Sequence, residues 1–201
     1  MIQYKKYYMP GTKEELLKTI DTIDCTYDIL AGGTDLYAKE KTPFNGADAA
    51  IDISGIKEFS VIKLKKEEGL ITFGSNICIQ QFLEEKVLME NVPILRHAAI
   101  YFADQQIREM ATVGGNVANS SPSGDTIAPL TALEAVIHTI TSKDNKICEK
   151  ETPITEFITG VGKNLLEKGE VISSITCPVL KEYGCAFKKV GLRLSLIHIS
   201  E

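Results

Sequence analysis

The sequence predicts an α+β protein whose two lobes meet near residue 55. Residues 1–55 combine strand-like apolar runs with one short helix, and residues 56–180 mix strands and helices in no repeating order. A chain of 201 residues is long enough for one or two small domains. We therefore assign a first α/β lobe to residues 1–55 and a second to residues 56–180.

In the first lobe, the pattern predicts a helix between two strands. Thr12 and Glu15 have the spacing of a capping box, so a helix is expected over residues 13–21. The apolar run at residues 27–31 predicts one strand, and residues 49–53 predict the next.

In the second lobe, apolar runs and turn residues predict a longer series of elements. Helices are expected over residues 79–86, 92–108, 125–133 and 154–159, and strands over residues 60–65, 70–74, 135–140, 146–149 and 171–176. The strands at 135–140 and 146–149 read as a hairpin, and residues 114–124 as a loop rich in glycine and serine.

Composition limits the classes of function. The net charge is −5 and no dense basic run is interleaved with aromatics, which argues against nucleic acid as a partner. The first residues turn polar within a dozen positions, so we expect no signal peptide, no membrane span and a cytoplasmic protein. The five cysteines are widely spaced without a C-x-x-C pair, which predicts reduced, buried thiols, no metal site and no iron–sulfur cluster on this chain.

Two glycine pairs are the candidate binding elements. Residues 31–35 and residues 112–116 each read as a strand followed by Gly-Gly and a polar residue. Glycine lets backbone amides come close to a ligand, and amides can hold a diphosphate. A Gly-Gly is also common in plain tight turns. Neither pair fits the Rossmann fingerprint, and the chain has no P-loop, so another nucleotide-binding fold is expected.

The residues around these pairs resemble a known family. AGGTDLYAKEK at 31–41 and QQIREMATVGGNVANSSPSGDTIAPL at 105–130 resemble two signature segments of the FAD-binding subunit of xanthine dehydrogenase-type molybdenum hydroxylases. Further segments, among them IDISGIKEFSVI, ITFGSNICIQQF and GEVISSITCP, follow in the family's order. The resemblance implies the two-lobed FAD-binding fold of the vanillyl-alcohol oxidase (PCMH-type) superfamily, with FAD extended between the lobes.

Carried over residue by residue, the resemblance implies a set of cofactor-binding positions. They are Ile29, Leu30, Ala31, Gly32, Gly33, Thr34, Asp35, Leu36, Phe102, Thr112, Val113, Gly114, Gly115, Asn116, Asn119, Asp125, Ile172 and Lys188.

Five of these positions have particular roles in the family. Asn119 and Asp125 match contacts to the ribityl and diphosphate region, Phe102 lies near the adenine, Ile172 packs on the isoalloxazine ring, and Lys188 lies near the flavin. From the bare sequence, each also has an ordinary interpretation: loop polarity, a helix N-cap, a core residue or a solvated lysine.

The resemblance also implies partners. In such enzymes a large subunit with molybdopterin hydroxylates the substrate, a small subunit carries two [2Fe–2S] clusters, and electrons reach FAD and then NAD+. We expect assembly as a dimer of heterotrimers. The chain lacks the cysteine-rich insertion of the hydroxybenzoyl-CoA reductase branch. No histidine is assigned chemistry, and no catalytic residue is expected, because a flavin supplies its own redox centre.

The end of the chain departs from the family. After residues 191–193 the family continues into a C-terminal domain, whereas here LSLIHISE follows, which resembles a translated sequencing adapter. We expect residues 181–201 to be the start of a truncated domain with a non-matching tail. Two alternatives stay open: a stand-alone flavin reductase of the same superfamily, and a binding or assembly module without redox function.

Overall fold

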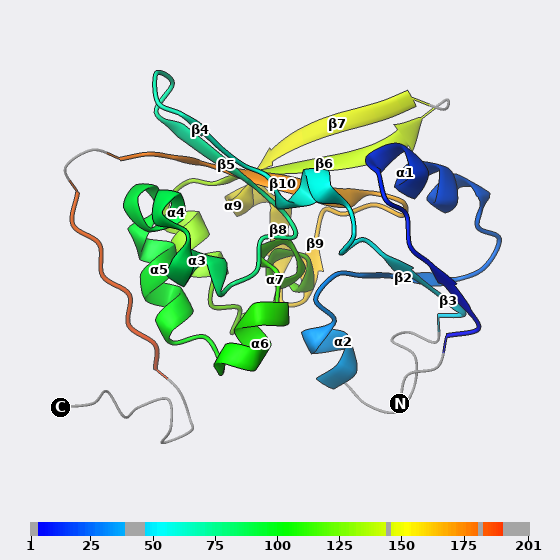
Figure 1. The fold of residues 1–201 in the computed structure, drawn as a ribbon, viewed down its shortest axis with the longest axis horizontal. Helices are drawn as coiled ribbons and strands as arrows, with labels where there is room; N and C mark the ends of the chain where they lie inside the picture. Colours follow the sequence, from blue (N-terminus) through cyan, green and yellow to red (C-terminus); the bar gives the residue numbers. More distant parts are fainter. Residues whose placement is uncertain (1–3, 39–46, 144–145, 181–182, 191–201) are drawn as a thin grey trace.

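The structure is a computed structural model that describes residues 4–38, 47–143, 146–180 and 183–190. A small sheet and a larger sheet lie side by side, as Figure 1 shows. The small sheet has the order β1-β3-β2 and is parallel, and the larger has the order β4-β5-β10-β6-β7 and is antiparallel. The tail predicted to be foreign, residues 194–201, lies outside the described residues.

The small sheet is built from the N-terminal part of the chain. Its elements are β1 (Lys6–Tyr8), α1 (Lys13–Thr22), β2 (Tyr27–Leu30), α2 (Thr34–Ala38) and β3 (Ala49–Asp52). The helix predicted at 13–21 is confirmed, and Thr12 caps it by accepting a hydrogen bond from the amide of Glu15 at 3.2 Å. The carboxylate of Glu15 accepts from the amide of Gly11 at 2.7 Å, one residue before the usual partner in a capping box.

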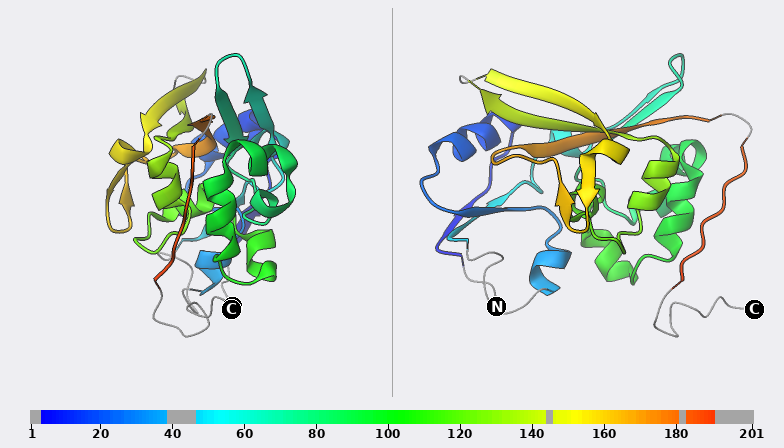
Figure 2. Two further views of the ribbon diagram at one scale, coloured as in Figure 1. Left: turned by 90° about the vertical axis from the view of Figure 1, so that its left-hand side faces the viewer. Right: turned by 180° about the vertical axis from the view of Figure 1, so that it is seen from behind.

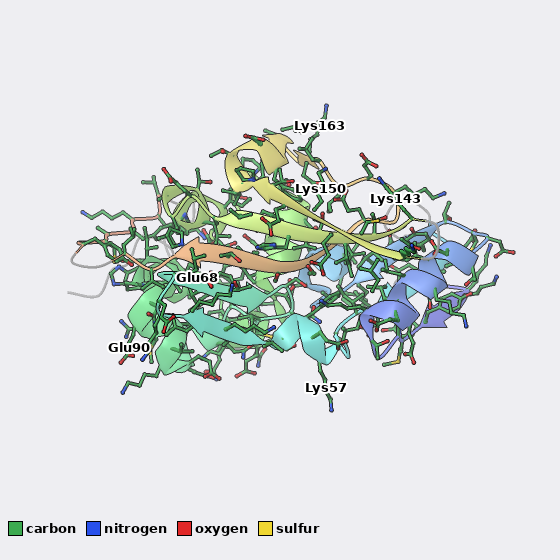
Figure 3. All side chains as sticks on the ribbon, turned by 90° about the horizontal axis from the view of Figure 1, so that it is seen from above. Lys57, Glu68, Glu90, Lys143, Lys150 and Lys163 are labelled. Carbon is green, nitrogen blue, oxygen red and sulfur yellow. The ribbon has the colours of Figure 1, made fainter. Side chains whose placement is uncertain are left out.

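The larger sheet carries the helices of the second lobe on one face. In chain order, this part of the structure begins with η2 (Lys57–Ser60), β4 (Ile62–Lys65), β5 (Leu70–Gly74), α3 (Gln81–Glu84), α4 (Lys86–Asn91), α5 (Pro93–Ile100), α6 (Gln105–Met110), α7 (Val113–Asn119) and α8 (Ile127–Ala132). They are followed by β6 (Val136–Lys143), β7 (Lys146–Pro153), α9 (Ile154–Phe157), β8 (Ile158–Gly160), β9 (Lys163–Asn164) and β10 (Val171–Pro178). Seen from above, the sheet covers the helices, and Lys57 and Lys163 point away from it on opposite sides (Figure 3).

Several predicted elements differ from the structure. The single helix expected at 92–108 is two helices, because Ala103 has a φ of 34° and Asp104 starts α6 as its N-cap. The helix expected at 79–86 is likewise divided at Glu85, whose backbone is extended. The loop expected at 114–124 contains α7. The strand expected before the second glycine pair is helix α6, followed by an isolated bridge between Cys78 and Thr112.

The core has two parts. The larger lies between the five-stranded sheet and its helices and includes Phe73, Phe82 and Phe157. The smaller packs Leu16 and Leu17 of α1 against Ile51, Ile140 and Val171. Ile140 and Val171 belong to β6 and β10, so the long strands reach across to cover α1, as the rear view in Figure 2 shows.

The cysteines correct one expectation. All five are free, but only Cys177 is buried, and the other four are partly exposed. Burial raises the pKa of the Cys177 thiol to about 12.

Candidate functional site

A cavity of about 620 Å3 opens between the two sheets. This volume lies within the range of small-molecule sites. One wall comes from the end of β2 and from α2, and the other from α6, α7 and the loop that follows α7. In Figure 1, α2 and α6 lie on the same side of the molecule, below the sheets.

The first glycine pair makes a close contact across the cavity. A Cβ on Gly32 would stand 1.9 Å from the carbonyl oxygen of Met110, so only glycine fits there. Gly33 has a φ of 68°, a conformation that favours glycine, and it begins the turn into α2. Among the described residues, the amides of Gly33 and Thr34 have no hydrogen-bond acceptor. Both residues line the cavity, so these amides are donors that a ligand can use.

The second glycine pair lies in the first turn of α7 and not after a strand. Its amides are already bonded: Gly114 donates to the carbonyl of Ser75 at 2.9 Å, and Gly115 donates to the hydroxyl of Thr112 at 3.1 Å. A Cβ on Gly114 would stand 2.5 Å from the Cβ of Ser75, so this glycine lets α7 pack on β5. The two pairs therefore differ, because the first leaves the Gly33 amide without an acceptor among the described residues, whereas the second brings α7 to the cavity.

Beyond the glycines, Asn116 offers a donor with a fixed orientation. Its Oδ1 accepts hydrogen bonds from the hydroxyl of Thr126 at 2.6 Å and from the amide of Thr126 at 3.3 Å. The side-chain oxygen is thereby occupied, which turns the NH2 group of the same amide toward other partners. Asn116 lines the cavity, so it can donate to a ligand there.

An ion pair marks the far end of the cavity. The Nζ of Lys189 lies 2.6 Å from Oδ2 of Asp125, and the two side chains are 21% and 12% exposed. The segment that carries Lys189 is extended and lies along α5, where Phe187 contacts Tyr101 with ring centroids 6.1 Å apart. Asp125 and Lys189 both line the cavity, and they place opposite charges side by side at this end.

Most residues predicted from the sequence lie at this cavity. Those in its lining are Ile29, Ala31, Gly32, Gly33, Thr34, Asp35, Leu36, Phe102, Thr112, Gly114, Gly115, Asn116, Asn119, Asp125 and Ile172. Three predicted residues are not in the lining. Leu30 and Val113 are buried in the core, and Lys188 is exposed while its neighbour Lys189 faces the cavity.

Sequence reasoning missed part of the lining, including Ser75, Asn76, Glu170 and Lys189. Ser75 and Asn76 follow directly after β5, and a polar pair at the end of an apolar strand is a signal that could have identified them. Glu170 gave no such signal. Its carboxylate accepts from the hydroxyl of Thr139 and, at 2.9 Å, from the amide of Glu167, so it fixes the loop before β10.

The lining as a whole combines two kinds of surface. Ile29, Ile53 and Ile172 supply apolar walls, whereas backbone amides and Asn116 supply hydrogen-bond donors. The charged groups of the lining are Asp35, Glu170 and the ion pair of Asp125 with Lys189. Such a site suits a ligand with both an apolar ring and an anionic group. Within the described ranges, no group of three His, Cys, Asp or Glu side chains is placed to hold a metal ion. No helix in these ranges has the length and apolar character to cross a bilayer.

Comparisons with known proteins agree with the site. Residues 2–180 match the family described as the FAD binding domain in molybdopterin dehydrogenase. The chain is 28% identical over 187 residues to the glyceraldehyde dehydrogenase medium chain of Sulfolobus acidocaldarius, covering 93% of this chain and 64% of that one. It is 31% identical over 167 residues to a putative xanthine dehydrogenase FAD-binding subunit of Escherichia coli, covering 82% and 56%.

The fold has a counterpart among solved structures. Carbon monoxide dehydrogenase from Hydrogenophaga pseudoflava contains a chain that superposes with a TM-score of 0.80 at 24% identity, covering 90% of this chain and 61% of that one. The chain thus spans roughly three fifths of the length of the proteins it matches, and this likeness confirms the predicted α+β FAD-binding fold. From the match over residues 2–180, the chain belongs to the family of FAD-binding domains of molybdopterin dehydrogenases.

Proposed function

We propose that the chain is the FAD-binding subunit of a xanthine dehydrogenase-type molybdenum hydroxylase. The cavity between the sheets is the observation that carries the proposal, because it combines apolar walls with hydrogen-bond donors, and a flavin dinucleotide has both an apolar ring and polar phosphates. Membership of the family supports the same ligand.

The described residues fit FAD at three places. Gly33 and Thr34 present amides without an acceptor, which suit the diphosphate. Asn116 presents its NH2 group in the same lining, and Lys189 lies there as the cationic partner of Asp125. Ile172 supplies an apolar surface for the isoalloxazine ring, and Phe102 supplies an aromatic surface for the adenine.

In this proposal the chain's own residues bind and orient the cofactor and provide no acid or base. When bound, FAD would supply the redox chemistry, taking electrons from [2Fe–2S] clusters on a partner subunit and passing them to NAD+. Gly32 and Gly114 keep the cavity walls in contact, because a side chain at either position would push them apart. Thr126, which is buried outside the lining, holds the Asn116 side chain in place before a ligand arrives.

The partners follow from the relatives' names. Similar proteins are the medium chains of glyceraldehyde and carbon monoxide dehydrogenases and the FAD-subunit of a nicotinate dehydrogenase. We infer that this chain assembles with a large molybdopterin subunit and a small [2Fe–2S] subunit, as a dimer of heterotrimers in the cytoplasm.

The test is retention of flavin by the full chain and by a variant that narrows the cavity. Gly115 lines the cavity and is exposed, and a Cβ there meets only the Thr112 hydroxyl at 2.9 Å. We expect Gly115→Val to lower flavin content and FAD affinity more than about ten-fold, because the added methyl groups occupy ligand space. Gly160→Val is the control, since a Cβ at Gly160 meets nothing nearer than 4.0 Å and lies outside the cavity.

Two results would contradict the proposal. If the full chain is colourless and does not bind added FAD, the assignment fails. If the chain binds FAD, but NAD+ does not reoxidise the reduced flavoprotein in a stopped-flow measurement, the assignment of NAD+ as acceptor fails.

A further inference from the structure

Two buried oxygens beside the cavity have no hydrogen-bond partner. Ser75 is 3% exposed and Asn76 is 7% exposed, and both line the cavity. Neither the hydroxyl of Ser75 nor Oδ1 of Asn76 has a partner among the described residues. A buried polar atom without a partner is unfavourable, so such atoms in a cavity wall indicate a ligand that completes them.

The backbone of this pair is held by hydrogen bonds, and so is the side chain of Asn76. The amide of Asn76 donates to the carbonyl of Phe59 at 2.8 Å, and its side-chain Nδ2 donates to the carbonyl of Ile53 at 2.7 Å. The bond from Nδ2 to Ile53 orients the Asn76 amide, and its Oδ1 is left as an acceptor without a donor among the described residues. This polarity is opposite to that of Asn116, whose oxygen is engaged and whose NH2 group is offered.

The pair lies between two parts of the proposed flavin site. The carbonyl of Ser75 accepts from the amide of Gly114 at 2.9 Å, which places it against the glycine pair of α7. The amide of Ser75 donates to the carbonyl of Ser173 at 3.0 Å, next to Ile172. Ser75 is therefore connected on one side to the segment assigned to the diphosphate and on the other to the residue assigned to the ring.

We propose that Ser75 and Asn76 bind the hydroxyl groups of the ribityl chain that joins the isoalloxazine ring to the diphosphate. The inference rests on the proposed function, because it takes FAD as the ligand. An acceptor such as Oδ1 of Asn76 requires a donor on the ligand, and a diphosphate at neutral pH has none, whereas each ribityl hydroxyl has one. In this proposal Ser75 and Asn76 bind the ribityl hydroxyls, while Asn116 and the first glycine pair bind the phosphates.

Ser75→Ala is the most direct test because it deletes an oxygen that has no partner in the free protein. We expect the dissociation constants of FAD and riboflavin to rise about three- to ten-fold, as for the loss of one hydrogen bond. The affinity for lumiflavin, which has the ring without the ribityl chain, stays unchanged. The melting temperature of the flavin-free variant stays equal to or above that of the unmodified chain, since no hydrogen bond is lost.

Ser173→Ala is the matched control. Ser173 is also buried, but its hydroxyl donates to the carbonyl of His138 at 3.2 Å and it does not line the cavity. We expect this variant to lower the melting temperature and to keep the affinity for FAD. Isothermal titration with FAD, riboflavin and lumiflavin, together with thermal melts of the flavin-free proteins, gives all of these values.

The outcomes separate this inference from the proposed function. If the unmodified chain binds FAD and Ser75→Ala binds it equally well, the ribityl assignment is wrong and the proposed function stands. An equal loss of affinity for lumiflavin would show that the Ser75 hydroxyl contacts the isoalloxazine ring and not the ribityl chain. A lower melting temperature of flavin-free Ser75→Ala would show that the hydroxyl stabilises the fold instead. If the unmodified chain binds no FAD, both proposals fail together.

Discussion

Gly32 lies against the backbone of Met110, and a Cβ at Gly32 would stand 1.9 Å from the Met110 carbonyl oxygen. Gly32 follows β2 in the small sheet, and Met110 ends α6 beside the larger one. This contact joins the two lobes directly beneath the proposed diphosphate site. It explains why glycine is required there in terms of packing between lobes, independently of any ligand.

Gly32→Ala should therefore destabilise the chain even without FAD. Because the obstacle at Gly32 is the backbone of Met110, relief requires the two segments to separate, and we expect a loss of about 2 kcal/mol in the free energy of unfolding. Urea denaturation of the flavin-free protein measures this loss. Gly55→Ala is the control, since nothing lies within 4 Å of a Cβ at Gly55. Equal stability of the two variants would contradict the packing argument.

Lys188 and Lys189 can be told apart by substitution with methionine. Lys189→Met leaves the Asp125 carboxylate, 12% exposed, without its cation, so we expect a loss on the order of 2 kcal/mol in stability. It should also lower the reduction potential of the bound flavin, because a nearby positive charge favours the more negative reduced state. Lys188 is exposed and outside the lining, so Lys188→Met should change neither quantity. A shift of potential in Lys188→Met alone would restore the role that the family resemblance assigns to it.

Tyr7 predicts how stability changes at alkaline pH. The hydrogen bond from its hydroxyl to Asp52, at 2.6 Å, together with burial raises the pKa of Tyr7 from 10.0 to about 12. A raised pKa in the folded state means that the stabilising contribution is complete below about pH 10 and is lost as the pH rises toward 12.

Tyr7→Phe should accordingly reduce the loss of unfolding free energy between about pH 10 and 12. Part of the loss should persist, because burial and the hydrogen bond to Asp28 also raise the pKa of Tyr4. Tyr101→Phe is the control, as the Tyr101 hydroxyl bonds to no described residue and Tyr101 is not among the groups that raise the pKa of Tyr7. An unchanged pH profile in Tyr7→Phe would show that the bond to Asp52 does not persist in solution.

Local patterns in the sequence were sufficient to predict the elements around the first glycine pair. An apolar run followed by Gly32 and Gly33 predicted a strand and a tight turn, and the structure has β2 followed by a residue with positive φ. Thr12 predicted the start of α1 because a cap is a contact between residues three positions apart. Such features depend only on neighbours along the chain.

The elements around the second glycine pair and Lys189 could not be predicted in this way, because they depend on contacts between residues far apart in the sequence. Thr112 is an N-cap, which makes Gly114 and Gly115 helical, but the same Gly-Gly pattern also suits a turn after a strand. Lys189 faces the cavity and Lys188 does not, because an extended segment sends alternate side chains to opposite sides and its register is set by Phe187 on Tyr101. Ser75 and Asn76 carry a local signal, a polar pair after an apolar strand, but only the folded structure shows that their side-chain oxygens have no hydrogen-bond partner.

The apolar face of α1 is covered by Ile140 and Val171, which lie more than a hundred residues further along the chain. While the ribosome is still adding those residues, Leu16 and Leu17 can pack only on earlier members of their cluster such as Ile51. The apolar face of α1 therefore reaches its native burial only after β6 and β10 have been synthesised.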